Sequence, residues 1–188
     1  MKNYLIFIPL ALLAACSPEA EEPAADKIIT PTSTAESATS ASATAADANT
    51  LTLDGLGALR IGQRIPSGSS FASRGAQIPG STCRTLSSPD YPGVVAMTVD
   101  GELRRITVSK GSNVALVEGI SAGATEAEVR ATFPGFQESP HKYLAAPGKY
   151  LTQPGADPRL HFEIDTDEKV SMIHVGTLPE LTWVEGCA

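Results

Sequence analysis

The sequence predicts an α+β domain in which one continuous antiparallel sheet carries helices on one side. Three observations predict it: a helix start signal, two strand hairpins, and self-similarity between the two halves of the chain. A helix followed by antiparallel strands, found twice in succession, is typical of this two-layer class. We expect one domain over residues 50–188, built from two diverged helix-plus-strand repeats at about 51–116 and 117–188.

The clearest helix signal lies in the second half. Thr125 is a good N-cap for residues 126–133, and Glu128 at the third helical position completes a capping box. The Pro-Gly pair at 134–135 is a typical helix stop. The corresponding segment of the first half, residues 67–76, is rich in Ser and Gly, so we expect a short or irregular helix there.

Each half then shows an alternating strand pattern. Apolar and polar residues alternate over 160–164, and a second apolar run follows at 170–175. In the register that gives one apolar face, Phe162 lies opposite Ile173. The first half repeats the pattern over residues 95–108, so both halves predict a hairpin with one buried face.

Self-comparison links the two halves. Residues 100–108 match 167–175, and Val-Glu-Gly at 117–119 recurs at 184–186 with the same spacing. Matches in a common order at a near-constant spacing favour a diverged tandem duplication.

The first residues have the order of a secretory signal, with one positive charge, a short apolar run and then small residues up to residue 15. The apolar run is shorter than the roughly 20 residues that a spanning helix needs. The stretch Leu-Ala-Ala-Cys at 13–16 resembles the lipobox of bacterial lipoproteins. The resemblance implies that Cys16 carries acyl groups and anchors the chain in a membrane. The alternative is an ordinary signal peptide with an incidental cysteine.

Residues 16–49 form the lipidated cysteine and a low-complexity stalk of Ala, Ser, Thr, Pro and Glu, which we expect to be disordered. By analogy with enterobacterial sorting, Ser17 after the lipidated cysteine favours the outer membrane, on its periplasmic or its surface face. The chain has 14 basic and 21 acidic residues and a net charge of −7. Without a basic stripe, nucleic acid is not an expected partner.

Two cysteines remain in the domain, Cys83 and Cys187. An isolated pair in a small secreted domain is more often bonded than free, which predicts a disulfide that ties down the C-terminal end. The alternative is a reactive thiol at Cys83, activated by the adjacent Arg84.

The helical start at 120–129 carries Ile120, Gly123, Thr125 and Val129, in the pattern I-x-x-G-x-T-x-x-x-V. It resembles the opening of β-lactamase-inhibitor-protein-like and BamE-like (SmpA/OmlA) domains. The resemblance implies a binding or scaffolding role, with the concave face of the sheet as the candidate surface.

The sequence contains three histidines. His161 and His174 become cross-strand neighbours in the predicted hairpin, with Glu163 on the same face. Such a set could bind Zn²⁺. Strand residues of mixed polarity normally form a solvated face, so we expect no metal and no cofactor. His141 is expected to lie exposed in a loop.

The sequence lacks a G-x-S-x-G elbow and a phosphate-binding glycine loop, so no catalytic residue is predicted.

Possible partner contacts lie in the Pro- and Gly-rich stretch 141–150. Tyr143, Lys149 and Tyr150 suit a protein contact there, with packing of the tyrosines as the alternative. The hypothesis that results is a non-catalytic lipoprotein of the bacterial envelope that binds another envelope protein. Two alternatives remain: an inhibitor of a secreted hydrolase, such as a β-lactamase or a cell-wall lytic enzyme, or an uncharacterised hydrolase.

Overall fold

The computed structural model describes residues 48–187, and these form a mostly β structure. Strands account for 39% of the described residues and helices for 7%, so the prediction of an α+β fold with helices on one side of the sheet is wrong. The predicted signal segment, Cys16 and the stalk up to residue 47 lie outside the described residues.

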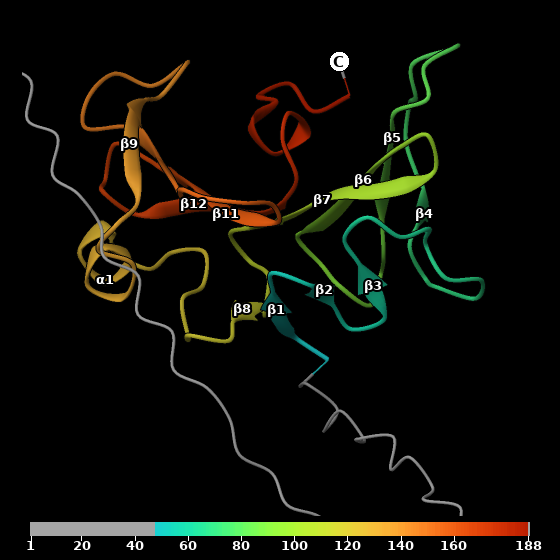
Figure 1. Cartoon of the computed structure of the whole chain (residues 1–188), viewed down its shortest axis with the longest axis horizontal. Helices are drawn as coiled ribbons and strands as arrows, with labels where there is room; N and C mark the ends of the chain where they lie inside the picture. Colours follow the sequence, from blue (N-terminus) through green and yellow to red (C-terminus); the bar gives the residue numbers. More distant parts are fainter. Residues whose placement is uncertain (1–47, 188) are drawn as a thin grey trace, which may run out of the picture. The chain divides into compact units, whose positions relative to one another are not determined.

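A large antiparallel sheet has the strand order β4-β5-β6-β7-β12-β11-β10-β9 (Figure 1). Its strands are β4 (Ala72–Ser73), β5 (Arg84–Ser87), β6 (Val94–Val99), β7 (Glu102–Ser109), β9 (Gln137–Pro140), β10 (Lys149–Thr152), β11 (Arg159–Ile164) and β12 (Val170–Gly176). At its centre β7 pairs with β12, which joins the first half of the domain to the second.

The predicted register of the second hairpin is confirmed, because Phe162 on β11 pairs with Ile173 on β12. The two central strands pair in the same way, with Val175 opposite Ile106 and Ile173 opposite Val108. Apolar side chains that alternate along each strand therefore gather on one face of the large sheet. The prediction of two helix-plus-strand repeats is wrong, because the described residues contain one α-helix, in the second half.

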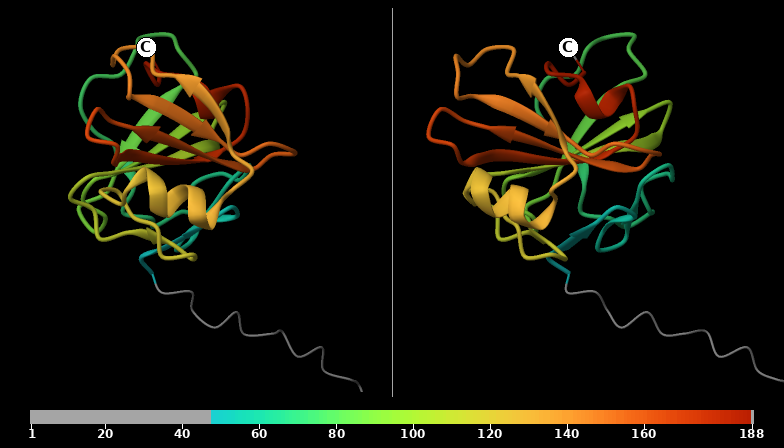
Figure 2. Two further views of the ribbon diagram at one scale, coloured as in Figure 1. Left: turned by 90° about the vertical axis from the view of Figure 1, so that its left-hand side faces the viewer. Right: turned by 60° about the vertical axis from the view of Figure 1, so that its left-hand side comes forward.

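A second, four-stranded sheet lies against this apolar face, in the order β3-β2-β1-β8. Its strands are β1 (Thr50–Thr52), β2 (Gly55–Leu56), β3 (Leu59–Arg60) and β8 (Ala115–Leu116). The pairing of β1 with β8 is parallel and connects the start of the domain to its middle. Two further views show this sheet and α1 on the same side of the large sheet (Figure 2).

The helix prediction succeeds in the second half and fails in the first. Helix α1 (Glu126–Thr132) has the predicted capping box, in which Thr125 accepts from the Glu128 N–H and Glu128 accepts from the Thr125 N–H. No helix forms over the described residues 67–76, where Gly68 and Gly75 have φ angles of 84° and 74°. These angles lie in the left-handed region and are incompatible with a helix.

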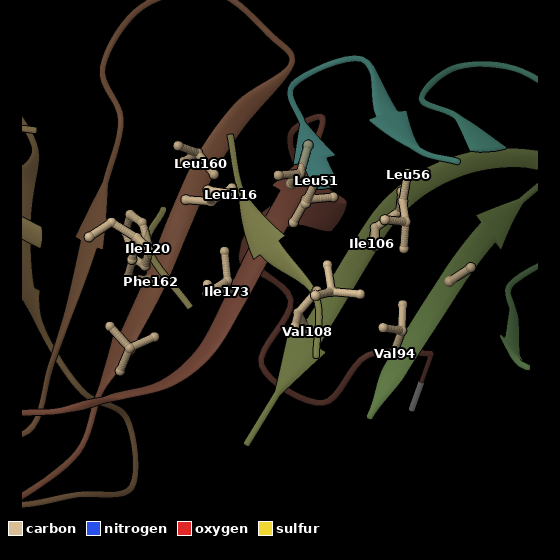
Figure 3. Close-up of a cluster of buried hydrophobic side chains, with 14 of the residues drawn as sticks. Leu51, Leu56, Val94, Ile106, Val108, Leu116, Ile120, Leu160, Phe162 and Ile173 are labelled. Carbon is tan, nitrogen blue, oxygen red and sulfur yellow. The ribbon is translucent and has the colours of Figure 1, made fainter. Parts of the chain in front are cut away.

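The core is the apolar layer between the two sheets. Figure 3 shows Leu51 and Leu56 of the small sheet meeting Ile106 and Val108 of the large sheet. Phe162 lies in the same cluster and is fully buried. Burying such side chains stabilises the fold by about 1.5–3 kcal/mol each.

The opposite face of the large sheet is covered in part by the C-terminal segment, residues 177–187 (Figures 1 and 2). This segment contains the short 3₁₀ helix η1 (Glu180–Thr182). The predicted disulfide between Cys83 and Cys187 is confirmed and joins the end of this segment to the residue before β5. Within residues 48–187, no helix has the length and apolar character needed to cross a membrane.

Replacing both cysteines, Cys83→Ala with Cys187→Ala, is expected to lower the free energy of unfolding by about 2–4 kcal/mol. The bond spans 104 residues, so its loss frees a long loop in the unfolded chain. Urea denaturation measures the change, with Val117→Ala at an exposed site as the control. Equal stability of the double variant and the wild type would contradict the prediction.

Candidate functional site

All three histidines of the chain meet on the face of the large sheet that lies opposite the core. His141, His161 and His174, together with Tyr150 and Glu163, are called the histidine cluster below. The ring centroids of His141 and Tyr150 are 4.5 Å apart, those of Tyr150 and His161 are 5.1 Å apart, and those of His161 and His174 are 5.5 Å apart. The expectation that His141 would be exposed is wrong, since its side chain is 7% exposed.

Strand register brings four members of the cluster together. His161 and Glu163 lie two residues apart on β11 and therefore share a face. His174 on β12 is the cross-strand partner of His161, and Tyr150 on β10 is the partner of Glu163. His141 joins them because the loop between β9 and β10 folds back over the sheet.

The cluster is buried rather than solvated, which corrects the expected polar, water-exposed face. His161 and His174 are only 6% and 3% exposed. Next to them, the buried Arg105 donates from Nη1 to the carbonyl oxygens of Glu180 and Trp183, at 3.0 and 2.7 Å. The C-terminal segment thus covers part of this face of the large sheet.

Glu163 receives hydrogen bonds from two imidazoles. His174 Nε2 lies 3.1 Å from Oε1, and His141 Nε2 lies 3.4 Å from Oε2. His141 Nδ1 accepts the N–H groups of Tyr143 and Leu144 at 3.1 and 3.2 Å. Because Nδ1 acts as an acceptor, the ring proton of neutral His141 lies on Nε2 and points to Glu163.

The burial of the cluster sets its charges. Burial and the nearby His174 lower the pKa of His161 to about 3. Burial likewise lowers the pKa of His174. For Glu163, burial acts to raise the pKa, but hydrogen bonds from His174 and His141 outweigh it and hold the pKa below its usual range. At neutral pH, His161 and His174 are therefore uncharged and Glu163 is ionised.

The arrangement does not suit the Zn²⁺ alternative. Across residues 48–187, no group of three or more histidine, cysteine or acidic residues is arranged to hold a metal ion. The proton on His141 Nε2 occupies the direction in which that nitrogen would have to offer its lone pair.

A hydroxyl, an imidazole and a carboxylate also follow one another in the cluster, because Thr107 Oγ1 lies 2.8 Å from His174 Nδ1. This is the order of groups in a hydrolase triad. The same contact recurs between Thr152 Oγ1 and His161 Nδ1, also at 2.8 Å. Each buried ring thus has a threonine partner on the neighbouring strand. The need to satisfy the buried ring nitrogens is enough to account for this sequence of hydroxyl, imidazole and carboxylate.

The three residues predicted as partner contacts are separated by the structure. Tyr143 is 60% exposed at the loop, whereas Tyr150 is buried and its hydroxyl accepts the Lys142 N–H at 3.2 Å. Lys149 turns toward α1 and pairs with Glu126 at 3.1 Å. Of the three, Tyr143 is therefore the one available to a partner.

Further exposed apolar side chains lie next to Tyr143 in the loop and in the C-terminal segment, and none of them was predicted from the sequence. Leu144, Trp183 and Val184 are each 37–38% exposed. We call these three and Tyr143 the loop–tail surface. An ion pair at 3.4 Å between Lys142 and Glu185 ties the loop to the C-terminal segment. The adjacent Trp-Val pair near Cys187 was the available sequence signal for this surface.

Comparison with protein-family models, with curated proteins and with solved structures found no match. The lipobox at 13–16 and the resemblance of residues 120–129 to inhibitor-like and BamE-like domains therefore stay predictions.

Acid should destabilise the domain through His161. Below about pH 6.5 the unfolded chain binds a proton on this residue, whereas the folded chain does not until about pH 3. The free energy of unfolding therefore falls as the pH falls between these values. In the variant His161→Asn, the slope between pH 6 and 4.5 is expected to be flatter by about 1.4 kcal/mol per pH unit.

Urea denaturation at several pH values measures this slope. The comparison uses the slope and not the absolute stability, so a uniform loss of stability in His161→Asn does not affect it. The variant Val117→Ala, changed at an exposed site without a titrating group, is the control and should keep the wild-type slope. An identical slope in wild type and His161→Asn would show that folded His161 takes up its proton like the unfolded chain.

Proposed function

We propose that the protein is a lipoprotein of the bacterial envelope, anchored through Cys16, and that its domain binds another envelope protein without catalysing a reaction. The observation that carries the proposal is the loop–tail surface. It presents Tyr143, Leu144, Trp183 and Val184 from two segments far apart in the sequence. Aromatic side chains of this kind are enriched in protein interfaces.

Both segments of this surface are held in place by contacts with the rest of the domain. The loop is held by His141 and Tyr150, which accept its backbone N–H groups. The C-terminal segment is held by Arg105 and by the disulfide at Cys187. A surface ordered before binding loses little conformational entropy on association, which favours affinity.

The position of the surface also suits a tethered binding module. Ala48, the first described residue, precedes β1 of the small sheet, whereas the loop–tail surface lies on the other side of the large sheet (Figures 1 and 2). The described residues therefore begin on the side of the large sheet away from the proposed contact.

A photo-crosslinking amino acid placed at residue 143 or at residue 183 of the full chain in intact cells should yield the same protein adduct. Placed at residue 117 it should not, although Val117 is 65% exposed, because it lies outside this surface. Leu144→Asp should reduce the adduct from residue 183 about tenfold, which corresponds to about 1.4 kcal/mol of binding. Val117→Asp should leave it unchanged.

Adducts that are identical at all three positions, or that ignore Leu144→Asp, would contradict a specific contact. If the adduct contains a secreted hydrolase and the purified protein inhibits that enzyme, the result supports the alternative function as an inhibitor that binds through the same surface. The exposed Tyr143 on a loop between two strands is the observation that favours this second candidate.

The anchor has a separate test. Cys16→Ala should abolish incorporation of radiolabelled palmitate and move the protein from the membrane fraction to the soluble fraction, because the acyl attachment site is lost. The double variant Cys83→Ala with Cys187→Ala is the matched control and should keep the label. Palmitate retained by Cys16→Ala would rule out this anchor.

A further inference from the structure

The backbone of the exposed loop is held by side chains of the histidine cluster. Three successive N–H groups are accepted: that of Lys142 by the Tyr150 hydroxyl, and those of Tyr143 and Leu144 by His141 Nδ1. The last two residues belong to the loop–tail surface, so one imidazole nitrogen determines how half of that surface is presented.

We propose that His141 acts as a pH-sensitive latch, which orders the loop–tail surface when the ring is neutral and releases it when the ring is protonated. This regulation rests on the proposed function for its biological meaning. The latch itself is a property of the domain and is tested without any partner.

The chemistry of the ring gives the mechanism. Neutral His141 carries its proton on Nε2, so the lone pair of Nδ1 faces the N–H groups of Tyr143 and Leu144. A proton added to Nδ1 turns this acceptor into a donor that faces two donors, and both hydrogen bonds are lost. Nε2–H keeps its carboxylate partner Glu163, 3.4 Å away. Protonation therefore strengthens the contact of Nε2 with Glu163 while it breaks the contacts of Nδ1 with the loop N–H groups.

Several titratable or charged groups surround His141. Glu163 and His161 lie on β11, Tyr150 on β10, and His174 on β12 reaches His141 through Glu163. Lys142 of the same loop is paired with Glu185 of the C-terminal segment. Within this set, burial keeps His161 and His174 uncharged, and hydrogen bonds from His174 and His141 keep Glu163 ionised. Among these groups, His141 is the one whose ring nitrogen accepts the N–H groups of Tyr143 and Leu144, so a proton acts on the loop through this ring.

A matched variant separates the latch from mere packing. The side-chain oxygen of Asn takes the place of Nδ1 and readily accepts N–H groups two and three residues further on, as in Asx turns. Those are the positions of Tyr143 and Leu144 relative to His141. Asn does not titrate in this range, so His141→Asn should keep the loop ordered and remove its dependence on pH.

The experiment measures amide hydrogen exchange of the full chain in detergent by NMR, at pH 7.5 and pH 5.0, corrected for intrinsic exchange rates. In the wild type, protection of the Tyr143 and Leu144 amides should fall at least about tenfold at the lower pH. The Phe133 amide, which bonds to Val129 O in α1, should not change and serves as the internal control. In His141→Asn the loop amides should keep the same protection at both pH values.

A second readout keeps the test decisive if His141→Asn disturbs the loop. The midpoint of the loss of protection should coincide with the titration of the His141 ring signals in the wild type. Unchanged protection in the wild type, a midpoint that follows another residue, or the same loss in an ordered His141→Asn variant would each overturn the latch. If the latch is found but residues 143 and 183 capture no partner, the proposed function fails and the latch stands.

Discussion

The pairing of β7 with β12 joins the two halves of the domain, and both faces of the large sheet depend on it. On one face it aligns Ile106 with Val175 and Val108 with Ile173, which completes the apolar layer that the small sheet covers. On the other face it places Thr107 beside His174. A shift of one residue in this pairing would exchange the two faces and bury polar groups in the core.

On the face of the large sheet opposite the core, polar side chains of the strands are buried beneath the C-terminal segment. The guanidinium of Arg105 is buried, and its Nη1 is satisfied by carbonyl oxygens of the C-terminal segment rather than by a carboxylate. Buried polar groups of this kind are costly unless they are hydrogen-bonded. The disulfide at Cys187 and the contacts of Arg105 therefore act together to hold residues 177–187 in place.

The histidine cluster links this buried face to the exposed loop. Glu163 connects His174, which is fixed in the sheet, with His141, which belongs to the loop. The cluster consists of hydrogen-bonded imidazole rings around one carboxylate, and His141 accepts the N–H groups of Tyr143 and Leu144. This arrangement orders the loop that carries part of the proposed contact surface.

The sequence by itself determined the local features. The capping box of α1, the pairing of Phe162 with Ile173, the neighbourhood of His161 and His174, and the Cys83–Cys187 bond were all predictable, because each follows from short-range spacing or from the chemistry of one residue type. Only the tertiary structure decided the fold class, since the two- and three-residue strands of the small sheet have no periodic pattern and β1 finds its partner β8 far along the chain. It also decided the site: His141 joins the cluster through a loop that folds back, and the C-terminal segment covers the face that strand alternation alone predicts to be solvated. Contacts between distant segments carry no local sequence signal, and for that reason the sequence predicted the two hairpins of the large sheet but neither the small sheet nor the exposed surface.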